Sequence, residues 1–160
     1  KCDWSSDVCS SDLGNALAIN GHDYKHYDNV LDAQMSVPFT AALALLHGDV
    51  TAQMFLPQTM AQPELRTLVE RIDARIDAEC ESIYPARRSA VVSIALKDGR
   101  RLEQRVYDPK GESDNPLSDA DLERKFTTNC EPVIGAARCA ALLDCVRGFE
   151  KLDGIGAIFG

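Results

Sequence analysis

The strongest constraint on the fold is a run of β-branched residues followed by an Asp-Gly pair and a second alternating run. Residues 90–96 read AVVSIAL, and residues 102–107 alternate apolar with polar side chains. Gly99 of the intervening Asp98-Gly99 pair tolerates the positive φ angle that a tight turn requires. The pattern therefore predicts a β-hairpin over about 90–107, and with it a small antiparallel sheet.

Helices are expected around this sheet because apolar residues recur elsewhere at helical spacing. Pro38 suits a first helical turn, Ser36 or Val37 precedes it as cap or staple, and Gly48 ends it. Leu122 and Phe126, four residues apart, are expected to form a buried face. Together with the hairpin, these patterns predict an α+β fold with helices at about 38–47, 63–71, 118–129 and 135–151.

The stretch YDPKGESDNPLSDADLERKF joins the hairpin to the third of these helices. Asp108-Pro109 stops a strand, because proline has no N–H to donate to a neighbouring strand. Ser118 is placed as an N-cap, and Asp121 three residues later completes a loose capping box. Pro132 is expected to start a separate segment. Pattern alone describes this stretch as a strand, a loop and a helix start, with no visible chemistry.

Composition is that of one globular domain. The chain has 160 residues, of which 45% are hydrophobic and 26% charged, which is enough for one domain with a real core. The net charge of −8 argues against a nucleic-acid partner. No apolar run reaches the length of a membrane span. We therefore expect a cytoplasmic protein with neither nucleic acid nor membrane as partner.

The positive charges are concentrated in one part of the chain. Ten of the 17 Lys and Arg residues lie between Arg66 and Lys110. On alternating strands they would form a solvated sheet face. If they converge in space, they would instead form a groove for small polyanions. The sequence leaves both possibilities open.

The first thirteen residues differ in character from the rest. Residues 2–13, CDWSSDVCSSDL, match the translation of a short-read sequencing adapter. The alternative is a native capped turn closed by a disulfide between Cys2 and Cys9. We favour the adapter, so residues 1–13 are expected not to be native protein and to pack poorly.

No metal centre is expected from the remaining cysteines and the histidines. Cys80, Cys130, Cys139 and Cys145 contain no C-x-x-C pair, and we expect buried free thiols. His22 and His26 have helical i, i+4 spacing, but the polar residues and glycine around them disfavour a helix. His47 is expected to cap carbonyls at a helix end.

Two separated motifs resemble those of the MmgE/PrpD family and occur in the family's order. Residues 109–111 (PKG), 115–118 (NPLS) and 125–126 (KF) resemble a P-K-G-x-P-x-N-P-L-[ST] and K-F pattern near the family's C-terminus. Residues 35–39 (MSVPF), followed by an Ala/Leu-rich helix and Gly48, resemble the family pattern F-S-[ILV]-P-Y.

This resemblance implies a domain organisation. Residues 14–160 would form a single, smaller C-terminal α+β domain of an MmgE/PrpD-like protein. A larger N-terminal helical domain, which supplies most acid-base residues in the family, would be missing. By the same analogy we predict a strand at 72–78, where spacing alone also fits a continued helix.

The resemblance also implies an activity for the parent protein. The parent would be a cofactor-independent lyase, a homodimer, that dehydrates 2-methylcitrate or a similar tricarboxylate in propionate catabolism. This fragment alone would be inactive. Dehydration needs a base, an acid and cations that hold the carboxylates. Lys110 is our candidate cation, Ser36 and Phe39 are candidates for a pocket wall, and no catalytic residue is assigned to this fragment.

Two alternatives remain. The domain could be a non-enzymatic interaction module, with the basic hairpin region as its binding face. The parent could also be a decarboxylase or epimerase of the same family. Phe39 stands where the family commonly has tyrosine, so a role for that hydroxyl does not carry over, and Phe39 is favoured as core.

Overall fold

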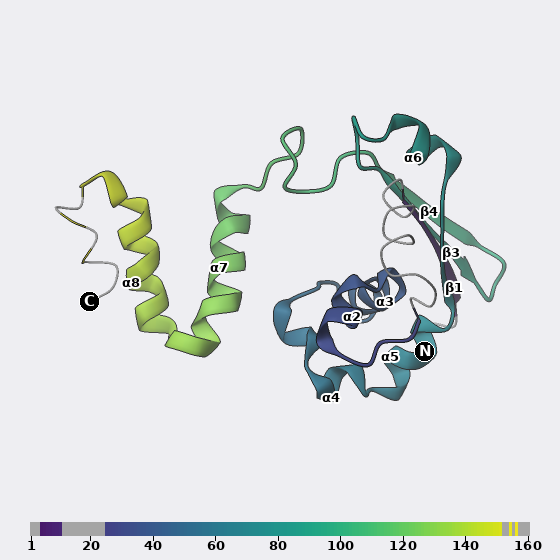
Figure 1. Cartoon of the computed structure of the whole chain (residues 1–160), viewed down its shortest axis with the longest axis horizontal. Coiled ribbons are helices and arrows are strands. Elements are labelled where there is room, and N and C mark those ends of the chain that lie inside the picture. Colours follow the sequence, from purple (N-terminus) through teal and green to yellow (C-terminus); the bar gives the residue numbers. More distant parts are fainter. Residues whose placement is uncertain (1–3, 11–24, 152–153, 155, 157–160) are drawn as a thin grey trace. The chain divides into compact units, whose positions relative to one another are not determined.

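The computed structural model describes residues 4–10, 25–151, 154 and 156 (Figure 1). The chain divides into two compact units, Lys1–Asn115 and Pro116–Gly160. The fold is α+β, as predicted, with the sheet in the first unit.

The sheet has four strands in the order β2-β1-β3-β4. β3 (Ala90–Leu96) and β4 (Arg101–Val106) form the predicted antiparallel hairpin, and Gly99 in its turn has a φ of 86°. β2 (Ile72–Arg75) confirms the predicted strand over its first half. The sheet is larger than predicted, because β1 (Trp4–Ser10) lies parallel to β2 and antiparallel to β3.

β1 lies inside the segment that we expected to pack poorly. Its backbone pairs with β2 on one side and β3 on the other (Figure 1). The packing of its side chains lies outside what the structure describes, so the expectation of poor packing stays a prediction. Strand pairing uses backbone N–H and C=O groups that nearly every residue type carries, so it does not decide whether the segment is native. The adapter assignment stays a prediction, and residues 1–3 and 11–13 lie outside the described residues.

The first unit contains both predicted helices. α3 (Val37–His47) is capped by Ser36 and ends at Gly48, whose φ of 75° is left-handed, and α5 (Pro63–Val69) agrees with the second prediction. Further short elements were not predicted. These are α2 (Val30–Met35), the 3-10 helix η1 (Ala52–Phe55), α4 (Pro57–Met60) and α6 (Ala78–Ile83).

A single hydrophobic core holds the first unit together. Its largest fully buried side chains are Phe39 and Leu43 of α3, Leu65 and Val69 of α5, and Ile72 of β2. α3 contacts both α5 and the edge strand β2, so the core lies between the helices and the β2 side of the sheet.

The second unit is a pair of helices, α7 (Asp119–Ile134) and α8 (Ala136–Arg147), followed by the 3-10 helix η2 (Phe149–Lys151). The predicted capping box of Ser118 and Asp121 is present. The boundary at Pro132 was wrong, because α7 contains this proline and continues to Gly135. The predicted helix over 135–151 is interrupted at Gly148.

The helices of the second unit bury little of their surface. α7 has no buried residue, and Cys139, which is 2% exposed, is the buried residue of α8. Leu122 is 50% exposed, which contradicts our expectation of a buried face there. The helices contact each other, and Arg147 pairs with Glu123 across them.

Within the described parts of the chain, none of the helices has the length and apolar character needed to cross a membrane.

Candidate functional site

Ser36 and Phe39 lie together at the start of α3. The Ser36 hydroxyl oxygen accepts a hydrogen bond from the Phe39 backbone N–H at 3.1 Å, and both side chains are buried. The Phe39 ring contacts the Tyr27 ring at 4.5 Å between centroids, and the Phe55 ring at 5.7 Å. Ser36 therefore caps the helix, and the Phe39 ring packs against the ring of Tyr27.

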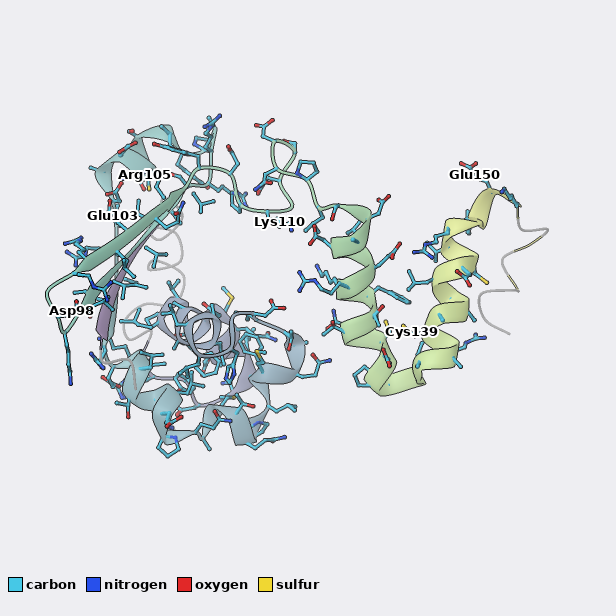
Figure 2. The ribbon with its side chains drawn as sticks, turned by 180° about the vertical axis from the view of Figure 1, so that it is seen from behind. Asp98, Glu103, Arg105, Lys110, Cys139 and Glu150 are labelled. Atoms are coloured by element: carbon cyan, nitrogen blue, oxygen red, sulfur yellow. The ribbon has the colours of Figure 1, made fainter. Side chains whose placement is uncertain are left out.

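Lys110 lies on a different element, the loop that follows β4 (Figure 2). Among the hydrogen bonds that shape this loop, Gly111 N–H donates to the Asn115 carbonyl at 2.7 Å, and the Asn115 side-chain amide donates to the Asp108 carbonyl at 2.9 Å. Gly111 has a φ of 107°, a conformation that glycine adopts without strain. The Lys110 side chain is exposed.

Two adjoining hollows lie beside the predicted pocket wall, and we call them together the Tyr27 site. Both are lined by Tyr27, Asp28 and Arg66. The smaller hollow, of about 150 Å³, is completed by Lys25, His26, Val69 and Glu70. The larger one is completed by Asn29, Val30, Pro57, Met60 and Ala61. The first is therefore mainly polar, and the second has a mainly apolar wall.

Tyr27 is the central residue of this site. Its side chain is 8% exposed, and its hydroxyl is buried without a hydrogen-bond partner among the described residues. The Arg66 guanidinium lies over the ring, 5.9 Å from the centroid. Burial raises the pKa of the Tyr27 phenol above its ordinary value of 10.0, and the charge of Arg66 opposes that shift. The phenol is therefore protonated at neutral pH and can donate a hydrogen bond.

The two cations of the site are held differently. The Lys25 ammonium donates to Asp73 Oδ1 at 2.9 Å and to the Glu70 carbonyl at 3.0 Å, so its charge is compensated. Arg66 donates through Nε to the Met60 carbonyl at 3.3 Å. The part of the chain that the structure describes provides no ion-pair partner for Arg66.

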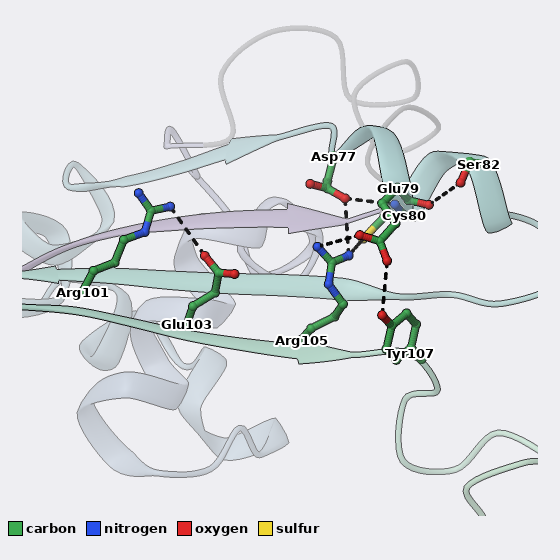
Figure 3. Close-up of polar contacts among 8 residues, drawn as sticks. All are labelled: Asp77, Glu79, Cys80, Ser82, Arg101, Glu103, Arg105 and Tyr107. Atoms are coloured by element: carbon green, nitrogen blue, oxygen red, sulfur yellow. Dashed lines mark hydrogen bonds and ion pairs between the residues drawn. The ribbon is translucent and has the colours of Figure 1, made fainter.

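The other candidate cluster surrounds Arg105 of β4 (Figure 3). Its guanidinium lies 3.5 Å from Asp77 Oδ1 and 3.3 Å from Glu79 Oε2, and the Tyr107 hydroxyl donates to Glu79 at 3.2 Å. The Cys80 backbone N–H donates to Asp77 at 3.0 Å, and this bond is the main reason that the pKa of Asp77 is lowered. The cluster fastens α6 to β4, because its polar groups bond one another.

The basic residues between 66 and 110 do not gather at one site. Arg105 pairs with acids of α6, Arg100 with Asp98, and Arg101 with Glu103. This pattern is that of a solvated face. Of the ten cations in the basic stretch, Arg66 alone lines the Tyr27 site.

The sequence pattern did not identify the Tyr27 site. Tyr27 and Arg66 are distant in the sequence, and neither belongs to a motif. The N-cap role of Asp77 could have been predicted from the sequence, because Asp followed by a helical segment is an ordinary N-cap signal. His22 lies outside the described residues, whereas His26 lines the smaller hollow.

The cysteines show no sign of a metal centre. Cys80 and Cys139 are buried, Cys130 and Cys145 are partly buried, and none of the four forms a disulfide with another described residue. No group of three or more His, Cys, Asp or Glu side chains that could hold a metal ion occurs in the described ranges.

Comparison with known proteins places the chain in a family. The family described as MmgE/PrpD C-terminal domain matches residues 14–151. Cis-aconitate decarboxylase of Mus musculus is 26% identical over 126 residues, which cover 79% of this chain and 26% of the relative. The protein of the same name from Homo sapiens is 25% identical over 122 residues, 76% of this chain and 25% of the relative. The chain thus spans about a quarter of the length of these curated relatives, and, because the family match covers most of it, it belongs to the MmgE/PrpD family.

Proposed function

We propose that this chain is the C-terminal domain of a lyase that acts on a citrate-like tricarboxylate, in the first instance by dehydrating 2-methylcitrate in propionate catabolism. The observation that carries the proposal is the match of residues 14–151 to the MmgE/PrpD C-terminal domain. A cytoplasmic location and a homodimeric parent belong to the same proposal.

The chemistry of the proposed reaction divides the roles between domains. Dehydration breaks a C–H bond next to a carboxylate and a C–O bond, and water leaves. The described histidines, His26 and His47, are exposed, and the charged groups around Arg105 pair with one another. We therefore assign the acid and the base to a larger helical domain of the parent. Lys110, Ser36 and Phe39 remain this chain's proposed contributions to the substrate pocket.

The helices of the second unit leave apolar side chains exposed, which supports packing against a further part of the protein. A helix pair in which α7 buries no residue gains little from the hydrophobic effect. Val133 is 81% exposed and Phe149 55% exposed. We propose that these helices pack against the remainder of the parent or against its second copy.

Decarboxylation of cis-aconitate is the second candidate, because both curated relatives described above carry that name. This reaction breaks a C–C bond, releases carbon dioxide and returns a proton to the carbon. It shares with dehydration the need for cations that hold the remaining carboxylates. The two candidates thus differ in the bond that breaks and not in the class of substrate.

The deciding experiment is an assay of the intact parent protein with 2-methylcitrate and with cis-aconitate. Mass spectrometry distinguishes loss of water from loss of carbon dioxide, and we expect one of the two. The 160-residue chain serves as the control and is expected to be inactive with both substrates. An intact parent that transforms neither substrate would support the interaction-module alternative. Activity of the chain alone would contradict our division of roles.

A further inference from the structure

We propose that Tyr27 and Arg66 bind a carboxylate group of a small organic anion at the hollow that they share. The proposal goes beyond the reaction of the parent, because it concerns a binding site on this chain alone. It is independent of which bond the parent breaks.

The first argument is the hydroxyl of Tyr27. A buried hydroxyl without a partner lowers stability, and such groups are rare in folded proteins. Phenylalanine would keep the ring contacts with Phe39 and Arg66 and would avoid this cost. An acceptor oxygen of a ligand would satisfy the hydroxyl, which explains why the group is present.

The second argument is the guanidinium of Arg66. Its Nε is bonded to the Met60 carbonyl, whereas no described acid pairs with the group. A planar guanidinium matches the two oxygens of a carboxylate, and its position over the Tyr27 ring already restricts its orientation. The Arg66 side chain is exposed, so its remaining N–H groups are accessible to a ligand oxygen.

The surrounding charges determine which anion fits. With Lys25 paired to Asp73, Arg66 shares the smaller hollow with the carboxylates of Asp28 and Glu70, so the hollow has no excess of positive charge. This balance argues against a polyanion, and a single carboxylate would be held by directed hydrogen bonds from the Tyr27 hydroxyl and the Arg66 guanidinium. A volume of about 150 Å³ has room for such a group and a few water molecules.

The larger hollow indicates what the carboxylate is attached to. Val30, Pro57, Met60 and Ala61 form an apolar wall beside the same tyrosine and arginine. An aliphatic chain of a few carbons can lie against this wall while its carboxylate faces Arg66. We therefore expect a short aliphatic carboxylate to bind better than an inorganic anion.

The test is a titration of the complete 160-residue chain with butyrate and, separately, with inorganic phosphate. Binding is followed by amide chemical shifts in NMR spectra. We expect butyrate to shift the amides around residues 27–30 and 66–70, with phosphate at least tenfold weaker. Tyr27→Phe and Arg66→Gln are each expected to weaken butyrate binding about tenfold, as the loss of one hydrogen bond to a charged group predicts.

Matched controls separate binding from structure. Tyr107→Phe removes a hydroxyl that is bonded to Glu79, and Arg100→Gln removes an exposed arginine on the hairpin turn. Neither should change butyrate binding. Tyr27→Phe should unfold at the same temperature as the parent sequence or higher, whereas Tyr107→Phe should unfold at the same temperature or lower.

Three outcomes would overturn the proposal. Unchanged butyrate affinity in both Tyr27→Phe and Arg66→Gln would show that these two residues do not bind the carboxylate. Phosphate binding as tight as that of butyrate would show a general oxyanion site instead of a carboxylate site. A lower unfolding temperature of Tyr27→Phe with unchanged affinity would give the hydroxyl a structural role. None of these results depends on the activity of the parent.

Discussion

The helices α3 and α7 begin in the same way and differ in what they bury. The Ser36 hydroxyl caps α3 by accepting the N–H of Phe39, and the Ser118 hydroxyl caps α7 by accepting the N–H of Asp121. α3 then buries Pro38, Phe39, Ala42 and Leu43, whereas α7 buries no residue. A cap therefore determines where a helix begins, and only packing determines how strongly it is held.

The same contrast separates the two units. The first unit has one continuous core, which includes residues from Tyr27 to Ile72 and is formed by helices and the edge strand β2. The second unit is held by contacts between two helices and by exposed ion pairs such as Arg147 with Glu123. Exposed ion pairs contribute little to stability, so we expect the first unit to be much the more stable.

The largest expected effect comes from removing a core aromatic ring. Phe39→Ala should lower the free energy of unfolding of the first unit by about 3 to 5 kcal/mol, because it leaves a cavity beneath Tyr27. Phe149→Ala makes the same chemical change at a side chain that is 55% exposed, and it should cost about 0.5 kcal/mol or less. Urea denaturation followed by circular dichroism measures both. A similar loss of unfolding free energy in the two variants would contradict the difference in packing between the two units.

The next effect concerns the glycines that end α3 and α7. Gly135 has a φ of 80° and a ψ of 155°, a region that is almost restricted to glycine, so Gly135→Ala should cost about 1 to 3 kcal/mol locally. Gly48 has a φ of 75° and a ψ of −1°, so Gly48→Ala should cost about 1 kcal/mol.

No heavy atom lies within 4 Å of a Cβ added at either glycine, so both costs come from backbone conformation. Helix content and urea midpoints of both variants test the ranking. A larger loss for Gly48→Ala would contradict it.

Replacing each capping serine with alanine tests whether the cap stabilises the whole unit or only the first turn of its helix. Ser36→Ala should lower the free energy of unfolding of the first unit by about 1 kcal/mol, since the cap belongs to the buried core. Ser118→Ala removes an equivalent bond at an exposed helix end and should mainly increase hydrogen exchange in the first turn of α7. Hydrogen exchange of the full chain shows which amides respond. If Ser118→Ala accelerated exchange in α3, the two units would not be energetically separate.

The smallest effect is a pH dependence at the edge of the first unit. The pKa of Asp77 lies below its ordinary value of 3.8, so its contribution is present above that value and is lost as the pH falls through the folded-state pKa. Hydrogen exchange of α6 should therefore increase at acidic pH before the core is affected.

Asp77→Asn keeps an N-cap that does not titrate. Its α6 should accordingly show a weaker acid response than the parent sequence. An identical response in both proteins would show that the acid sensitivity of α6 does not come from Asp77.

Local sequence signals predicted much of the first unit. Asp98-Gly99 located the hairpin turn, and Ser36 and Gly48 bounded α3, because each acts through the backbone of its near neighbours. α2 and α6 were not predicted, although Asn29 and Asp77 cap them. Each is six residues long, and so short a helix has too little periodicity to be recognised.

The errors arose where distant contacts decide the outcome. The spacing of Leu122 and Phe126 predicted an apolar face, but it cannot say whether another element covers that face, and Leu122 is 50% exposed. Pro132 looked like a helix boundary, yet a helix can continue past a proline at the cost of one hydrogen bond. The parallel pairing of β1 with β2 joins residues more than sixty positions apart and leaves no local signal.

The sequence by itself determined the α+β class, the hairpin, the capped helix starts and, through its two motifs, the family. These features depend on backbone preferences and on neighbours within a few residues. Only the tertiary structure placed the Tyr27 ring between Phe39 and Arg66. Among the described residues it left the Tyr27 hydroxyl without a hydrogen-bond partner and Arg66 without an acidic partner. Such an arrangement depends on where α3 and α5 pack, and side-chain packing between distant segments is not encoded in local spacing.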